Sequence, residues 1–80
     1  MNYTRHIKNK MTMRDALVLY RIKHGAECAF QLIDEDISDV SASTIIEKLV
    51  KLGLIERKPH PKDRRRNLLV ITDAGKELAE

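Results

Sequence analysis

The sequence predicts a small, mostly helical α+β domain, in which three helices are followed by a two-stranded β-hairpin and a short C-terminal helix. Two patterns favour this class. Apolar residues recur at helical spacing between Ala42 and Leu52. Further along, two short apolar segments, 54–57 and 68–71, flank a loop rich in Lys and Arg, as the strands of a hairpin would. The 80 residues suffice for one domain near the small end of what folds on a single core.

The first predicted helix begins after Thr12 and ends before Gly25. Asp15 stands three residues after Thr12, where a carboxylate can accept a hydrogen bond from the exposed backbone amide of the capping residue. Gly25 is a stop signal, because glycine adopts the left-handed conformation that ends many helices. The residues expected to form the buried face are Ala16, Leu17, Leu19, Tyr20 and Ile22.

The second predicted helix is short and covers residues 26–33. The side chains that it is expected to bury are Cys28, Ala29, Leu32 and Ile33. Residues 34–39 follow, and four of these six residues are acidic. This acidic segment lacks the glycine and the spacing of a calcium loop, so it is interpreted as a solvated turn or as a surface for a protein partner.

The third predicted helix has the most regular pattern. Either Ser38 or Ser41 could cap its start, and Ser38 is preferred, whereas Gly53 ends the helix. The apolar residues that fall on one face are Ala42, Ile45, Ile46, Leu49 and Leu52. This face is expected to pack into the core.

A basic hairpin follows the third helix. Its predicted strands are Leu54-Ile55-Glu56-Arg57 and Leu68-Leu69-Val70-Ile71. Six of the ten residues 57–66 are Lys or Arg, and Asp63 is the only acid among them. Packing does not explain such a hairpin tip, because each charged side chain must stay hydrated, whereas contact with phosphate explains it well.

The last element is a helix that Thr72 caps and that begins at Asp73, where an acid suits the first turn. Helices two and three, joined by a short turn, form a helix-turn-helix whose third helix can enter a major groove, and the hairpin is a wing. We therefore expect a basic N-terminal arm over residues 1–11 and a winged helix-turn-helix domain over residues 12–80.

From Gly53 onward the sequence resembles the winged helix-turn-helix of the MarR family of bacterial transcription regulators. The matching residues are Gly53-Leu54-Ile55-Glu56-Arg57, Pro59, Pro61, Asp63-Arg64-Arg65, Leu68, Ile71-Thr72 and Gly75. An Asp followed two residues later by an Arg, and then by a strand that ends in Thr-x-x-Gly, is a fairly specific signature of the wing. Leu49 and the helix before it also fit, and the topology upstream is compatible.

The resemblance implies roles for particular residues. Arg65 would enter the minor groove, and Asp63 would steady it. The exposed face of the third helix, which would read the major groove, comprises Val40, Ser41, Ser43, Thr44 and Lys48. The remaining DNA-binding residues expected in the wing are Arg57, Lys58, Lys62, Arg64 and Arg66. Thr44 departs from the pattern, because the family often has Arg at this position.

The family's long dimerisation helices are absent or vestigial in these 80 residues. A homodimer is nevertheless expected, because one helix and one wing make a small contact with DNA. The apolar residues available for it are Tyr3, Ile7, Met11, Leu78 and Ala79.

Two functions are weighed. The leading hypothesis is a sequence-specific, double-stranded DNA-binding transcription regulator that acts as a repressor. The alternative is a winged-helix adaptor for a protein partner, which the acidic segment and Thr44 favour. Purely structural interpretations of the basic loop remain open: it could be a solvated turn, and Asp63 could simply hold that turn through the backbone.

Several other classes are not indicated. The single cysteine, Cys28, allows no internal disulfide and is expected to pack in the core, which fits a cytoplasmic protein. No apolar run approaches the ~20 residues that span a membrane. His24 and Cys28 are too few ligands for zinc, so no metal or cofactor is expected. No nucleophile stands with a plausible base, and an enzyme is not expected.

Overall fold

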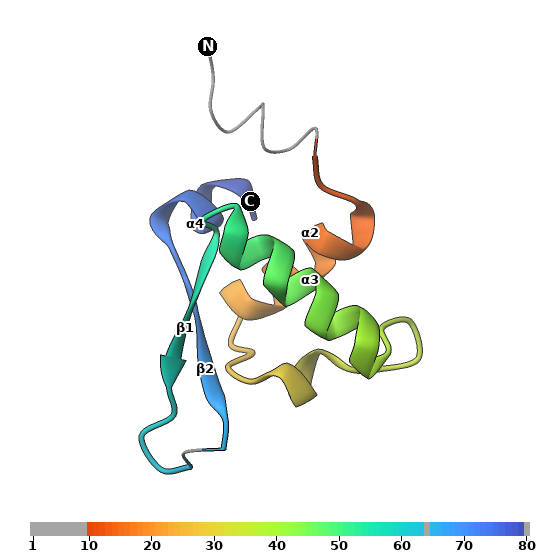
Figure 1. The fold of residues 1–80 in the computed structure, drawn as a ribbon. Coiled ribbons are helices and arrows are strands. Elements are labelled where there is room, and N and C mark those ends of the chain that lie inside the picture. The colour runs from red at the N-terminus through yellow and green to blue at the C-terminus, as the bar shows by residue number, and fades with distance from the viewer. Residues whose placement is uncertain (1–9, 64, 80) are drawn as a thin grey trace.

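The computed structural model describes residues 10–63 and 65–79. In chain order its elements are helix α2 (Met13–Lys23), the 3₁₀-helix η1 (Ala29–Leu32), helix α3 (Asp39–Lys51), strands β1 (Ile55–Pro59) and β2 (Asn67–Ile71), and helix α4 (Asp73–Leu78) (Figure 1). This order confirms the predicted fold class, a mostly helical winged helix-turn-helix. Within the described residues, no helix has the length and apolar character needed to cross a membrane.

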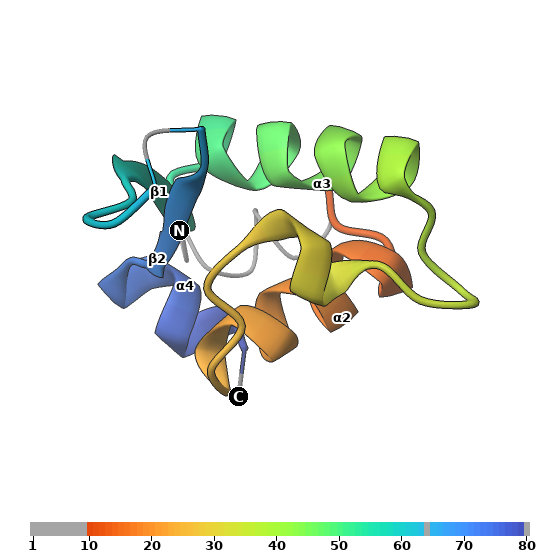
Figure 2. The same ribbon diagram turned by 90° about the horizontal axis from the view of Figure 1, so that it is seen from below.

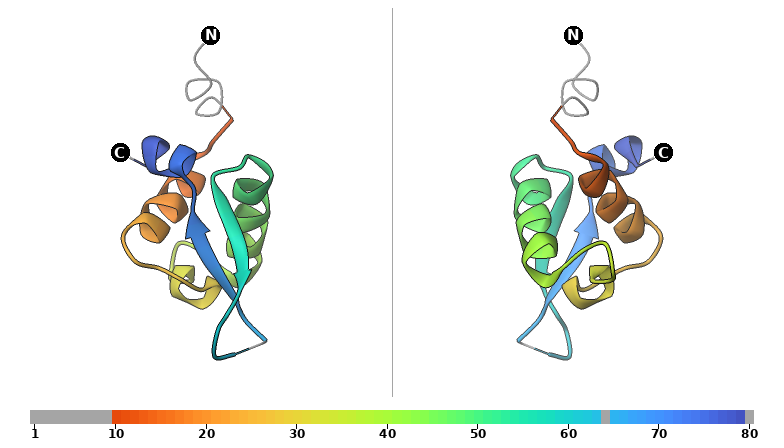
Figure 3. Two further views of the ribbon diagram at one scale, coloured as in Figure 1. Left: turned by 90° about the vertical axis from the view of Figure 1, so that its left-hand side faces the viewer. Right: turned by 90° about the vertical axis from the view of Figure 1, so that its right-hand side faces the viewer.

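The core lies between α3 on one side and α2, η1 and α4 on the other, as Figure 2 shows. Figure 3 shows the hairpin between these two groups of helices, with its tip projecting beyond them. The largest fully buried side chains are Leu19, Leu32, Ile37, Leu49, Leu54, Ile55 and Val18. The core is therefore aliphatic, and the polar tip of the wing lies outside it.

Helix α2 begins with the predicted capping box. The Asp15 amide donates to Thr12 Oγ1 at 3.2 Å, and the Thr12 amide donates to Asp15 Oδ2 at 2.9 Å. The expected buried face was only partly right, because Ala16 is exposed and the Tyr20 side chain is 51% exposed. The face that packs inward follows the spacing i, i+3, i+4, i+7 and comprises Asp15, Val18, Leu19 and Ile22. Gly25 follows α2 with a φ of +118°, as expected of a residue that ends a helix.

The prediction of a helix over residues 26–33 is wrong. Only the four residues of η1 are helical, and they form a 3₁₀-helix. Its start is held by a contact with distant sequence, because the Leu69 amide of β2 donates to the Glu27 carbonyl at 2.7 Å. Gln31 Oε1 accepts hydrogen bonds from the Glu27 and Cys28 amides at 2.6 and 2.9 Å. These bonds keep residues 27 and 28 out of a helix.

The burial of this segment also differs from the expectation. Cys28 and Leu32 are buried as predicted, whereas Ala29 is half-buried and Ile33 is exposed. Ile37, which the sequence left within the acidic segment, is fully buried instead. The Asp34 carboxylate accepts from the Asp36 and Ile37 amides at 2.8 and 3.0 Å, and the resulting turn points Ile37 into the core.

Helix α3 matches its prediction closely. Ser38 is the cap, since its hydroxyl oxygen accepts from the Ser41 amide at 3.1 Å. Gly53, with a φ of +76°, follows the helix end. The buried residues of α3 are Ala42, Ile45, Ile46 and Leu49, and Leu52 is half-buried.

Strands β1 and β2 pair antiparallel, in a register from Ile55 opposite Ile71 to Pro59 opposite Asn67. Thr72 caps α4 as predicted, because its hydroxyl oxygen accepts from the Gly75 amide at 3.1 Å. The same hydroxyl donates to the Gly53 carbonyl at 2.7 Å, which joins the start of α4 to the end of α3. The wing is thus anchored at its base by both flanking helices.

The apolar residues expected to be available for a dimer are largely used within the chain or lie outside the described residues. Leu78 is buried in the chain's own core, so it offers no surface to a second copy. Met11 and Ala79 are partly buried against that core. Tyr3, Ile7 and nearly all of the predicted basic arm lie outside the described residues. The boundary at residue 12 stays a prediction.

Candidate nucleic-acid interface

The tip of the wing is closed by hydrogen bonds around His60. Its Nδ1 atom accepts from the Lys62 and Asp63 amides, each at 3.1 Å. The His60 amide donates to the Arg66 carbonyl at 3.3 Å, and the Arg66 amide donates to the Asp63 carbonyl at 3.1 Å. The sequence reasoning missed His60, although a histidine between two prolines in a basic loop could have drawn notice. These bonds give the basic tip a defined shape.

Asp63 holds two arginines of the tip. Its Oδ1 atom accepts from the Arg65 amide at 3.0 Å and lies 3.4 Å from Arg65 Nε. Its Oδ2 atom lies 3.3 Å from Arg66 Nε. The hydrogen bond from the Arg65 amide, together with the two arginine side chains, holds the pKa of the Asp63 carboxyl below its usual value. Asp63 therefore stays charged and braces the turn.

The basic side chains of the wing differ in their exposure and in their contacts with the rest of the protein. The side chain of Arg65 is 91% exposed at the tip. Lys58 and Lys62 are exposed as well, whereas Arg64 lies outside the described residues. The Arg66 guanidinium carbon lies 4.8 Å from the centre of the Phe30 ring, a cation–π contact with η1. Arg57 on β1 forms an ion pair with Glu47 of α3 at 3.1 Å.

The outer face of α3 carries the residues expected to read DNA. Val40 is 76% exposed, and Ser43 and Thr44 are exposed beside it. Thr44 Oγ1 donates to the Val40 carbonyl at 3.0 Å, which turns that hydroxyl back toward the helix. Ser41 is half-buried, and its hydroxyl oxygen accepts from the Ser38 hydroxyl at 3.1 Å. The face is thus rich in short hydroxyl side chains, which discriminate poorly between bases.

Lys48 is tied to the start of α2. Its Nζ atom lies 2.5 Å from Oδ2 of Asp15, a residue that is only 3% exposed. Burial works against the charged form of Asp15, but the hydrogen bonds from Lys48 and the Thr12 amide outweigh it and hold the pKa of the carboxyl below its usual value. This ion pair fastens α3 to α2, the helix that precedes the helix-turn-helix, a role that the sequence reasoning did not assign to Lys48.

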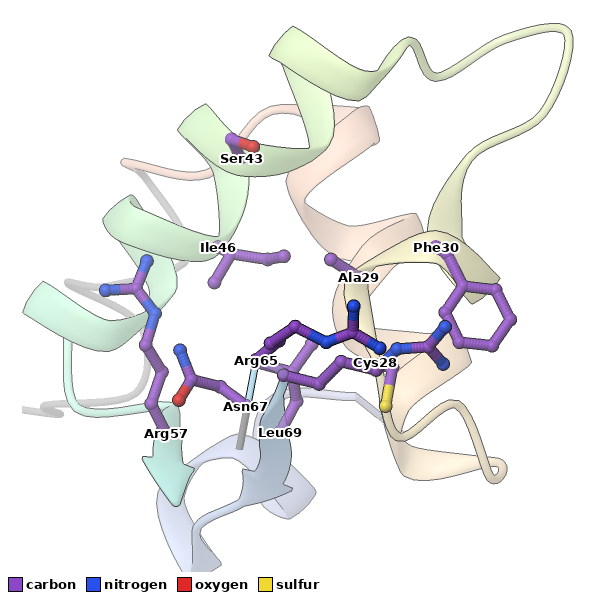
Figure 4. Close-up of a pocket in the computed structure, with 10 residues that line it drawn as sticks. Cys28, Ala29, Phe30, Ser43, Ile46, Arg57, Arg65, Asn67 and Leu69 are labelled. Carbon is purple, nitrogen blue, oxygen red and sulfur yellow. The ribbon is translucent and has the colours of Figure 1, made fainter. Parts of the chain in front are cut away.

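A pocket of about 370 Å³ joins the wing to α3 and η1 (Figure 4). Figure 4 shows Arg57 on one side of it and Phe30 on the other, with Ser43 on the α3 side. Arg65 and Arg66 also line it. Three of the predicted wing arginines, Arg57, Arg65 and Arg66, therefore share one surface with Ser43 on the outer face of α3. A concave surface with guanidinium groups at its border suits a negatively charged partner.

The acidic segment lies at the start of α3, away from the wing (Figure 1). Asp34 pairs with Arg21 of α2 at 2.5 Å. The hydrogen bond from the Asp36 amide, assisted by Arg21, lowers the pKa of the Asp34 carboxyl. Asp34 is thus part of the turn that buries Ile37. Among the described residues, no three His, Cys, Asp or Glu side chains gather as a metal ion would require.

Residues 11–75 match the family model of a winged helix DNA-binding domain. A probable transcriptional regulator from Pseudomonas aeruginosa is similar in structure, with a TM-score of 0.74, 28% identity, and 89% of this chain and 55% of that chain covered. RV1404 from Mycobacterium tuberculosis aligns with a TM-score of 0.82 at 20% identity, covering 95% and 53% of the two chains. The reduced form of MarR from E. coli aligns with a TM-score of 0.78 at 24% identity, covering 90% and 54%.

None of the curated proteins compared with the chain matches it. The chain spans about half the length of the solved structures that it resembles. The family model covers most of the described residues, from the start of α2 into α4, and the fold is that of the MarR winged helix-turn-helix. The chain therefore belongs to the family of winged helix DNA-binding domains, and its winged helix-turn-helix is MarR-like.

Proposed function

We propose that this chain binds double-stranded DNA as a transcription regulator that acts as a repressor. In this proposal α3 lies in a major groove and the wing follows the adjacent minor groove. The observation that carries it is the placement of Arg65, which is 91% exposed at the end of a wing that Asp63 and His60 hold in shape. A planar, weakly hydrated guanidinium suits a narrow minor groove, where the negative potential is enhanced.

The face of α3 supports contact more than strong base selection. Val40, Ser43 and Thr44 are exposed along one side of the helix. They can approach base edges through a methyl group or a hydroxyl, but none offers the two-pronged hydrogen bonding that distinguishes guanine or adenine. We therefore propose that the wing and the shape of the DNA supply much of the affinity, with α3 giving moderate selectivity.

The test is a salt titration of binding to a duplex pool of random sequence. Arg65→Gln is expected to weaken binding at least roughly ten-fold, as the loss of one charge-assisted contact would. It should also reduce the slope of log affinity against log salt by about 0.9, the value for one phosphate contact. Lys76→Gln is the matched control, because Lys76 is exposed on α4, at the opposite end of the hairpin from the tip (Figure 1). It should change neither quantity.

The competing function, an adaptor for a protein partner, draws its support from the acidic segment. Glu35, Asp36 and Asp39 are exposed there. If wild-type protein fails to bind duplex DNA at low salt, or if Arg65→Gln and Lys76→Gln behave alike, the DNA proposal is wrong and the adaptor is favoured. The membership in a DNA-binding family supports a binding role rather than a catalytic one.

A further inference from the structure

Arg66 directs its polar groups toward the protein rather than outward. Its side chain is 53% exposed, against 91% for Arg65, although the two residues are neighbours. Its Nε atom faces Asp63, its amide donates to the Asp63 carbonyl, and its carbonyl accepts from the His60 amide. Its guanidinium lies over Phe30 at 4.8 Å. Arg66 therefore joins the tip of the wing to η1, a different element.

Phe30 lies in η1, a segment that is held in place relative to the hairpin. The residues before it are held to β2 by the bond from the Leu69 amide to the Glu27 carbonyl at 2.7 Å. Leu32, two residues later, is fully buried in the core. Phe30 itself is 57% exposed, which is unusual for the chain's only phenylalanine in a protein with so few aromatic residues. Its ring is placed to receive a cation from the wing.

We propose that Arg66 is a positioning residue: its contact with Phe30 docks the wing tip against η1 and so aims Arg65 at the minor groove. The inference rests on the proposed DNA binding and assigns different roles to two adjacent arginines. Arg65 contacts the DNA, and Arg66 sets the angle from which Arg65 does so. A planar guanidinium can lie over a ring and pair with Asp63 at the same time, whereas the point charge of a lysine cannot reproduce both contacts.

The docking can be tested without DNA, by NMR relaxation of the backbone amides of wing residues 62–66. Phe30→Leu keeps an apolar side chain but removes the ring face, so the amides of Lys62 and Asp63 should become more mobile and exchange faster with solvent. Tyr20→Leu is the matched control, because Tyr20 is another half-exposed aromatic residue, at 51%, and lies on α2. It should leave the wing unchanged. A wing that is equally ordered in Phe30→Leu and wild type overturns the proposal.

The second measurement is the salt titration applied to the same variants. Phe30→Leu should weaken DNA binding about two- to five-fold, the range for an exposed cation–π contact, and should leave the salt slope unchanged because no phosphate contact is lost. Arg66→Lys should weaken binding by a similar factor, also with little change in slope. In the Arg66→Lys background, Phe30→Leu should have almost no further effect.

A different pattern would make Arg66 a direct ligand of DNA. In that case Arg66→Lys would bind like wild type, Arg66→Gln would lower the salt slope by about 0.9, and Phe30→Leu would have no effect on affinity. The two proposals can fail separately. If wild type does not bind DNA but Phe30→Leu loosens the wing, the function is wrong and the docking is right.

Discussion

At the scale of single residues, the buried carboxylate of Asp15 joins helix α2 to helix α3. Its carboxylate completes the capping box of α2 and at the same time pairs with Lys48 of α3. Asp15 is only 3% exposed, and a buried charge without partners would be strongly unfavourable. Asp15 thereby couples the start of α2 to the last turn of α3.

We expect Asp15→Asn to lower the free energy of unfolding by about 1–2 kcal/mol, the range for a lost helix cap and a lost hydrogen bond to a charged group. Urea denaturation at neutral pH measures it. The loss should shrink in acid. Because the folded pKa of Asp15 is lower than the unfolded one, its charge stabilises the fold fully above about pH 4, and this stabilisation disappears as the pH falls through the folded pKa.

The control for that experiment is Asp39→Asn, since Asp39 is exposed in the first turn of α3. It should change the free energy of unfolding at neutral pH only slightly. If Asp15→Asn and wild type lose stability in parallel as the pH falls from 5 to 2, the ion pair with Lys48 contributes nothing to stability.

At the scale of elements, local signals in the sequence located every helix whose boundaries depend on nearby residues. Ser38 caps α3, Thr72 caps α4, and Thr12 with Asp15 caps α2, as predicted. The second helix could not be predicted in this way. The Glu27 carbonyl accepts a hydrogen bond from Leu69 of β2, which lies some forty residues later in the chain, and no local pattern reveals such a partner.

The same distinction between local and distant partners applies to the candidate site. The exposed tip and the brace between Asp63 and Arg65 could be inferred from a short motif, since the two residues are only two positions apart in sequence. The partners of Lys48, Arg57 and Arg66 could not, because Asp15, Glu47 and Phe30 come from other elements. The sequence therefore predicted Lys48, Arg57 and Arg66 to be available for DNA, whereas in the structure each of them contacts a side chain of another element.

The junction between the hairpin and α4 requires the glycine at position 75. A Cβ atom there would lie 2.2 Å from the Leu54 carbonyl oxygen and 2.7 Å from Ile71 Cγ1. We expect Gly75→Ala to destabilise the protein by about 1–3 kcal/mol, because overlap with backbone outweighs the ~1 kcal/mol by which alanine favours a helix. Thermal unfolding measures the change, and Lys76→Ala, next to it on the exposed side, should stay within about 0.5 kcal/mol of wild type. A neutral Gly75→Ala would mean that α4 does not pack this closely.

At the scale of the whole molecule, one α3 and one wing form a small surface for DNA. A single module of this kind buries about 600–1,000 Å² on DNA, which leaves little room for both affinity and selectivity. Two copies on a two-fold site would double the contact. The described residues do not supply an obvious dimer surface, because Leu78 is already used in the core.

Selection from a random duplex pool is therefore expected to enrich an inverted repeat, with two chains per duplex by light scattering. The reason is that the second copy adds a second wing and helix to the same duplex. Enrichment of a lone half-site, with one chain bound, would show that this chain acts as a monomer. The measurement does not depend on knowing the regulated gene.

The bond between the Leu69 amide and the Glu27 carbonyl also bears on how the chain avoids aggregation. A two-stranded ribbon offers two open edges, and each can recruit a strand from another molecule. Here the outer edge of β2 is partly occupied by the chain itself, and β1 ends in Pro59, which has no amide hydrogen to donate. The ribbon is therefore a poor template for strand addition, and it can project far from the core while remaining selective for partners that recognise side chains.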